Sequence, residues 1–224
     1  LEVLKDYRLD LGGYSLLTMD FTFAGLGKDV PAMTGHAESR DLMLKGLLDG
    51  RLAEYSEGGS SQETILEGPD GKPFRDKSQT GQTTLMGMDY IALVDLLNSD
   101  GTDNQEYRPY IDRLEVQNQQ TDNGLQAIGI KRLGLEGLSI RPPETNMMAI
   151  ADALFLAVTK QSEPDEMLVK KALIAAFDLY RSFSVKRLYV EELTASSNLP
   201  DFMFGFDVGR IEGLDISSNG LNTM

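Results

Sequence analysis

The sequence predicts an α+β fold: an extended, twisted and mostly antiparallel β-sheet with bulged strands and with helices packed on one face. Two observations predict it. A short sequence motif, in which an arginine is followed by alternating apolar and polar residues, recurs along the chain. Stretches with helical periodicity lie between some of its copies. Alternation with period two is typical of a strand with one buried face, whereas a period near 3.6 indicates a helix.

The clearest copy of the motif covers residues 130–140, with the sequence IKRLGLEGLSI. Its apolar positions are Leu133, Leu135, Leu138 and Ile140. They alternate in steps of two except for one step of three, which is typical of a bulged strand, and Gly137 stands where a bulge needs an unusual backbone conformation. Further copies cover residues 185–195, 208–216 and 111–116.

Domain organisation follows from the recurrence. At Gly87 and Gly137 a glycine followed by an apolar residue leads from a strand pattern into a helical pattern. This predicts a degenerate internal β-β-α repeat with irregular spacing. The chain is therefore expected to be a single domain, 1–224, with a finer division at the acidic stretch 98–106. The two duplicated lobes would be a β-rich N-terminal lobe, 1–105, and an α+β C-terminal lobe, 106–224.

The N-terminal half is expected to begin with a long strand over residues 7–25. One parity of this strand is wholly apolar and should form its buried face: Leu17, Met19, Phe21 and Phe23. Asp49-Gly50 between two apolar runs favours a hairpin with a tight primed turn, although 38–48 also fits a short helix. The polar stretches 57–61 and 68–73 are expected to be loops. A strand at 80–88 then enters a helix at 89–97, with Asp89 as its N-cap.

The C-terminal half has the clearest helical patterns. In 144–160 apolar residues occur around much of the circumference, so this helix should be buried on more than one side. A second helix is expected from Ser162 to about Arg181. It has one apolar stripe, formed by Val169, Leu173, Ala176, Phe177 and Tyr180.

Composition excludes some classes of function. The 224 residues carry a net charge of −14 without basic runs, which disfavours nucleic acid as a partner. No stretch of the covered chain approaches the roughly 18 apolar residues of a transmembrane segment. The absence of cysteine excludes disulfides and cysteine nucleophiles. The sequence starts at Leu1, so a signal peptide or a membrane anchor could precede it. Repetitive β-rich sequence, abundant glycine and the absence of cysteine lead us to expect a periplasmic or bacterial cell-envelope location.

Catalytic, cofactor and metal motifs are weak. His36 is the only histidine, and no nucleophile motif accompanies it. The segment Gly25-Leu26-Gly27-Lys28 fails the phosphate-loop pattern because an earlier glycine is missing. The acidic stretch 98–106 fails the EF-hand register, which favours a solvated turn over a calcium site. We therefore expect no catalytic residue, no cofactor and no metal.

The recurring arginines have two interpretations. A row of guanidinium groups across neighbouring strands could bind anions, since strands lie about 4.8 Å apart. In each copy of the motif, however, the arginine is followed within a few residues by a carboxylate, as in Arg113-Leu114-Glu115. This favours a ladder of mutually neutralising ion pairs on a solvent-facing surface.

Methionine and phenylalanine residues define the candidate site. Adaptable thioethers and aromatic rings suit an apolar groove, and equally an ordinary core. The candidate ligand-binding residues are Met86, Met88, Met147, Met148, Phe155, Met203 and Phe204. We expect a non-catalytic binding or scaffold protein that offers an apolar groove or a sheet edge to a hydrophobic small molecule or a protein partner. The alternative is a hydrolase that uses loop carboxylates from 98–106 with His36.

Overall fold

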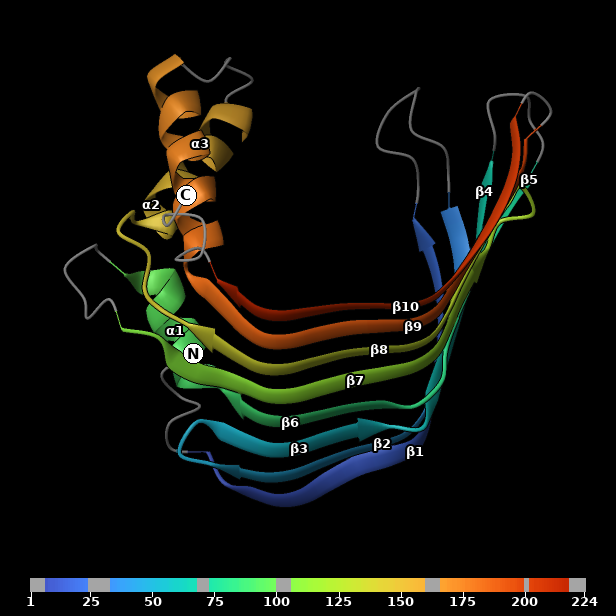
Figure 1. Cartoon of the computed structure of the whole chain (residues 1–224), viewed down its shortest axis with the longest axis horizontal. Helices are drawn as coiled ribbons and strands as arrows, with labels where there is room; N and C mark the ends of the chain where they lie inside the picture. Colours follow the sequence, from blue (N-terminus) through green and yellow to red (C-terminus); the bar gives the residue numbers. More distant parts are fainter. Residues whose placement is uncertain are drawn as a thin grey trace.

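The α+β class and the mostly antiparallel sheet are confirmed. In a computed structural model of the chain, the described residues are 7–23, 33–67, 73–99, 106–159, 166–199 and 202–217. Within these ranges ten strands form a single antiparallel sheet, and three helices stand together at one end of it (Figure 1). The strands are β1 (Leu9–Phe23), β2 (Met33–Leu48), β3 (Arg51–Glu57), β4 (Gly59–Glu67), β5 (Pro73–Thr80), β6 (Thr83–Asp89), β7 (Arg108–Asp122), β8 (Gln126–Ile140), β9 (Phe183–Leu199) and β10 (Phe202–Ser217). The helices are α1 (Tyr90–Asn98), α2 (Met147–Thr159) and α3 (Glu166–Arg181).

The sheet is a meander in chain order. β3 and β4 lie end to end against β2, and β5 and β6 lie end to end against β7. The ten strands therefore form eight antiparallel ribbons, which run from β1 at one edge to β10 at the other. Because β7 pairs with β5 and β6, the sheet continues without interruption between the parts of the chain before and after residue 105.

The turn after β2 is the predicted hairpin. Asp49 and Gly50 have φ angles of +50° and +75°, and positive φ at both central residues is the requirement of a type I′ turn. The alternative helix at 38–48 is wrong, because these residues belong to β2. The predicted loop at 57–61 is also wrong: β3 ends at Glu57 and β4 begins at Gly59, so only Gly58 separates the two strands.

A first line of kinks crosses the sheet near the helices. Positive φ angles occur on every second ribbon from β2 to β10, at Gly46, Gly87, Gly137 and Asp215. Strand pairing keeps the same register on both sides of Gly137. The step of three between the apolar positions Leu135 and Leu138 therefore arises from a kink at Gly137. The predicted bulge, which would insert an extra residue, is absent at this position. The bulge lies elsewhere, between Pro109 and Ile111 of β7.

A second line of kinks crosses the sheet further from the helices. Asp41, Asn118 and Glu192 have φ angles near +50°. In the register of the sheet they line up with the breaks that separate β3 from β4 and β5 from β6. Between the two lines the strands form a broad floor, and beyond the second line they turn upward and form a wall (Figure 1). The helices stand at the opposite end, so the sheet has a concave face and a convex face.

The compact core lies where the helices meet the sheet. Ala92 and Leu96 of α1 pack with Ile140 of β8, and Leu179 of α3 and Phe183 of β9 lie against this cluster. As predicted, Asp89 caps α1: its carboxylate accepts hydrogen bonds from the backbone N–H groups of the two residues after Tyr90. The core is small, and within the described ranges most of the sheet has no covering layer.

The helices α2 and α3 are far more exposed than the sequence predicted. Phe155 of α2 is 68% exposed, so burial on more than one side is wrong. The predicted apolar stripe of α3 also faces solvent, with Phe177 71% exposed, and the packed side of this helix contains Ala175 instead. The predicted start of α3 at Ser162 lies outside the described residues. Among the described helices, none has the length and apolarity that a membrane crossing requires.

Candidate ligand-binding face

The two faces of the sheet have opposite chemistry. Residues that pair across strands lie on the same face, so the register sorts the floor into rows. One row, read from β2 to β9, contains Leu44, Tyr55, Leu85, Leu114, Leu135 and Leu188. The next contains Val116, Leu133, Val190 and Ile211. The row between these two and the rows that flank them belong to the opposite face. The flanking rows are mainly charged, with Arg113, Glu136 and Arg187 in one and Arg132, Glu191 and Arg210 in the other.

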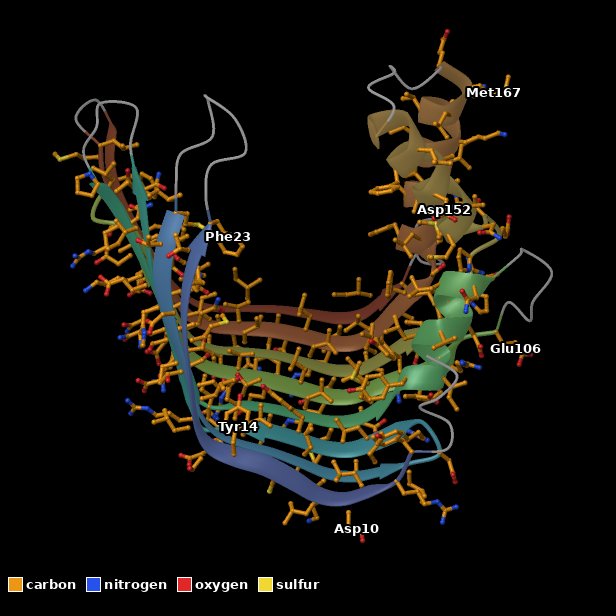
Figure 2. The ribbon with its side chains drawn as sticks, turned by 180° about the vertical axis from the view of Figure 1, so that it is seen from behind. Asp10, Tyr14, Phe23, Glu106, Asp152 and Met167 are labelled. Carbon is orange, nitrogen blue, oxygen red and sulfur yellow. The ribbon has the colours of Figure 1, made fainter. Side chains whose placement is uncertain are left out.

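The apolar rows lie on the concave face. In Figure 2 Phe23 points into the space between wall and helices, whereas Asp10 points away from it. A chain of hydrogen bonds joins the face of the floor to the face of the wall across the second line of kinks. Tyr55 donates to Glu57 at 3.0 Å, Ser39 donates to Glu57, and Tyr14 donates to Ser39 at 3.0 Å. Floor and wall therefore share one continuous concave face.

The wall presents apolar side chains near both edges of the sheet. On β1 they are Leu17, Met19, Phe21 and Phe23. On β8, β9 and β10 they are Ile128, Ile130, Leu193, Phe204 and Phe206. The sequence predicted burial for the β1 set, and this is wrong: Leu17, Met19 and Phe23 are between 52% and 58% exposed. Among the described residues, no second layer covers this apolar surface.

A polar strip separates the two apolar parts of the wall. It consists of uncharged residues of β2, β4 and β5, namely Ser39, Ser60, Gln62, Ser78 and Thr80. These side chains line a hollow of about 340 Å³, together with Leu17 and Met19 of β1 and the charged residue Glu38 of β2. The hollow thus offers hydroxyl and amide groups directly beside exposed apolar side chains.

The structure separates the groove residues that the sequence suggested. Met88 and Phe204 lie on the concave face, and the Phe204 ring stacks on that of Phe206 with centroids 6.0 Å apart. Met86 and Met203 have the opposite parity and lie on the convex face. The remaining three residues belong to α2: Met147, Met148 and Phe155. Sequence reasoning missed the exposed residues of β1 because the same alternation also fits a covered strand.

The convex face of the floor is a lattice of ion pairs. Arg187 contacts Glu136 of β8 at 3.2 Å and Glu212 of β10 at 2.6 Å. Arg210 contacts Glu191 and Glu212, at 3.4 and 3.1 Å. The predicted ladder of neutralising pairs is therefore confirmed, and most pairs join neighbouring strands.

Glu115 of β7 is the most enclosed carboxylate of this lattice. It accepts hydrogen bonds from Arg113 at 2.7 Å, Gln117 at 2.8 Å and Tyr189 at 3.0 Å, and Arg132 lies 3.6 Å away. Burial favours the neutral acid and would raise its pKa. The donated hydrogen bonds and the charge of Arg132 outweigh burial, so the pKa of Glu115 lies below its ordinary value.

His36 lies on the convex side of the wall, where its Nδ1 is 2.7 Å from Asp20 Oδ1. This hydrogen bond raises the pKa of His36 above its ordinary value. Because the folded pKa is raised, any stabilisation from the pair is present at low pH and is lost as the pH rises through the folded pKa.

We expect Asp20→Asn to lower the pKa of His36, because the replacement removes the negative charge that favours the imidazolium. The measurement is a proton NMR titration of the imidazole, which is unambiguous with one histidine in the chain. Identical titration curves for wild type and variant would contradict the assigned pair.

His36 and the acidic stretch are far apart in the fold. His36 belongs to the wall, whereas Glu106 lies beside the helices at the other end of the strands (Figure 2). Residues 100–105 of this stretch and the segment 25–28 lie outside the described residues. Within the described ranges no group of three or more His, Cys, Asp and Glu side chains could hold a metal ion.

Comparison of the chain with protein-family models, with curated proteins and with solved structures found no match. Any functional proposal therefore depends on the chemistry of the two faces.

Proposed function

We propose that the chain is a non-catalytic binding protein whose concave face holds the apolar part of an amphiphile such as a lipid. The observation that supports it most is the set of exposed apolar side chains on that face, beginning with Met19 of β1 and Phe206 of β10. Large exposed apolar patches mark interaction sites in folded proteins. Each side chain of this size contributes about 1.5–3 kcal/mol when it is fully buried.

An amphiphile fits better than a purely apolar molecule. Acyl chains would lie along the apolar side chains of β1 or of β8 to β10. A carbonyl, ester or hydroxyl group would meet the uncharged strip, where Ser60 and Thr80 face the hollow of about 340 Å³. Glu57 is the charged residue of the concave floor, and it accepts hydrogen bonds from Tyr55 and Ser39. The other charged groups of the floor are held on the convex face by ion pairs, which leaves the concave floor mainly apolar.

Two further proposals belong to this function. We propose a periplasmic or cell-envelope location, supported by the acidic, cysteine-free composition and the recurrent strands. We also propose that the sheet arose by internal β-β-α duplication. It is supported by the recurrence of a positive-φ glycine before an apolar residue at Gly46, Gly87 and Gly137, and by the helices that follow the second and third of these strands.

The test is a titration with a fluorescent polyene fatty acid. Met19→Glu and Phe206→Glu each place a charge among the apolar side chains of the concave face. We expect either replacement to weaken binding about tenfold or more, which corresponds to about 1.4 kcal/mol. The matched control is Met203→Glu, because Met203 is 79% exposed on the convex face and its replacement should leave affinity unchanged.

Unfolding in urea shows whether the variants keep the stability of the wild type. The proposal fails if the wild type shows no saturable binding. It also fails if Met203→Glu weakens binding as much as Met19→Glu does at equal stability.

A further inference from the structure

In the part of the chain that the structure describes, the sheet ends in two edge strands, β1 and β10. Among the described residues β1 pairs only with β2, and β10 pairs only with β9. The two edge strands have 15 and 16 residues, and an exposed strand of this length is a template for pairing with another strand. Since β1 and β10 are the first and the eighth of eight antiparallel ribbons, they run in opposite directions. β1 of a second copy, laid beside β10, would therefore continue the antiparallel meander.

The first line of kinks fixes how such a pairing would be aligned. This line crosses β10 at Asp215 and reaches β1 at Asp10, which lies opposite Gly46 between the pairs formed by Leu9 and Leu11. Placing Asp10 of one copy opposite Asp215 of the other aligns the rows of the concave face. The resulting pairs are Leu9 with Ile216, Gly12 with Gly213, Tyr14 with Ile211, Leu17 with Val208, Met19 with Phe206 and Phe21 with Phe204.

The same alignment explains two leucines on the charged face. Leu11 of β1 is 64% exposed and Leu214 of β10 is 65% exposed. Both side chains lie on the convex face, at the two ends of one row of paired residues. Between them this row contains Lys45, Glu54, Met86, Arg113, Glu136 and Arg187. Leucine thus stands at both ends of a mainly charged row. In the proposed register Leu11 of one copy lies directly opposite Leu214 of the next.

We propose that β10 of one copy pairs with β1 of a second copy in this register, so that the concave face continues from molecule to molecule. The alternation along the first line of kinks also continues: β10 has a positive φ at Asp215, β1 has none among its described residues, and β2 has one at Gly46. The two edges differ, so the contact is heterologous, and it repeats as an open stack or a closed ring. The assembly does not depend on a ligand, and its test is separate from that of the proposed function.

Site-specific cross-linking tests the pairing, because the chain has no cysteine of its own. Chains with Leu11→Cys and chains with Leu214→Cys are mixed and treated with a short bis-maleimide. We expect covalent dimers that contain one chain of each kind, and no dimers when either variant is treated alone. An offset control mixes Leu11→Cys with Asp207→Cys, which the register places far apart along the strands and which should not cross-link.

Homodimers from Leu214→Cys alone would show that like edges pair and would overturn the proposal, as would equal yields from the offset control. Sedimentation of the unmodified chain gives a second measurement that uses no cross-linker. The like charges of Asp10 and Asp215 oppose the pairing, so Asp10→Lys should increase the share of assembled chains and Leu214→Glu should abolish it. A chain that sediments as a monomer at high concentration, with Asp10→Lys as well, would also overturn the proposal.

Discussion

Gly87→Ala should lower the free energy of unfolding by about 2–4 kcal/mol. Gly87 lies on the first line of kinks with a φ of +68°, a conformation that costs an L-residue with a side chain about 1–2 kcal/mol. A Cβ at this position would also overlap the carboxylate of Asp112 on the neighbouring strand. The replacement therefore adds to backbone strain a steric clash that forces the Asp112 side chain or the strand to shift. The measurement is equilibrium unfolding in urea.

Gly209→Ala is the matched control for this prediction. Gly209 lies in β10, has no positive φ, and a Cβ there would meet nothing within 4 Å. Its replacement should change stability by no more than about 0.5 kcal/mol, because it neither strains the backbone nor clashes. Equal losses for Gly87→Ala and Gly209→Ala would show that glycine itself, and not the kink, matters in this sheet.

Glu115→Gln should lower the free energy of unfolding at neutral pH by about 1–3 kcal/mol. The amide cannot balance the charges of Arg113 and Arg132, and it replaces one carboxylate oxygen with a donor that faces other donors. The exposed pair of Asp20 and His36 provides the control: Asp20→Asn should lower the free energy of unfolding far less than Glu115→Gln does, because solvent screens the exposed pair. Urea unfolding of both variants checks the contrast.

The effect of Glu115→Gln should shrink in acid. The pKa of Glu115 is lowered in the folded chain, so its ionised form favours folding. This stabilisation is complete above the ordinary value of 4.5 and is lost as the pH falls through the folded pKa. The difference in stability between wild type and Glu115→Gln should therefore narrow below about pH 4.5. A constant difference between neutral and acidic pH would contradict the role assigned to this carboxylate.

Local features of the fold could be predicted from the sequence wherever one residue type decides the geometry. Asp49-Gly50 gave the hairpin because few other pairs accept two positive φ angles. Asp89 gave the start of α1 because its side chain accepts hydrogen bonds from the backbone. Gly137 marked a change of direction for a related reason, although the sequence could not separate a kink from a bulge.

The exposure of the apolar faces could not be predicted. Alternation in β1 shows that Met19 and Phe23 share a face, and a covered sheet would have the same pattern. The stripe of α3 that contains Leu173 and Phe177 is equally ambiguous, because periodicity gives no information about what packs on it. Kinks at non-glycine residues such as Glu192 also escape prediction, since glutamate has no preference for a positive φ.

The most direct test of the binding role is native mass spectrometry of the chain after gentle extraction from the cells that produce it. The account predicts a second mass that exceeds the chain by the mass of a lipid and that disappears when Met19→Glu and Phe206→Glu are combined. It also predicts that Met203→Glu retains the adduct. If protein purified without detergent gives a single mass equal to that of the bare chain, the result would contradict the account.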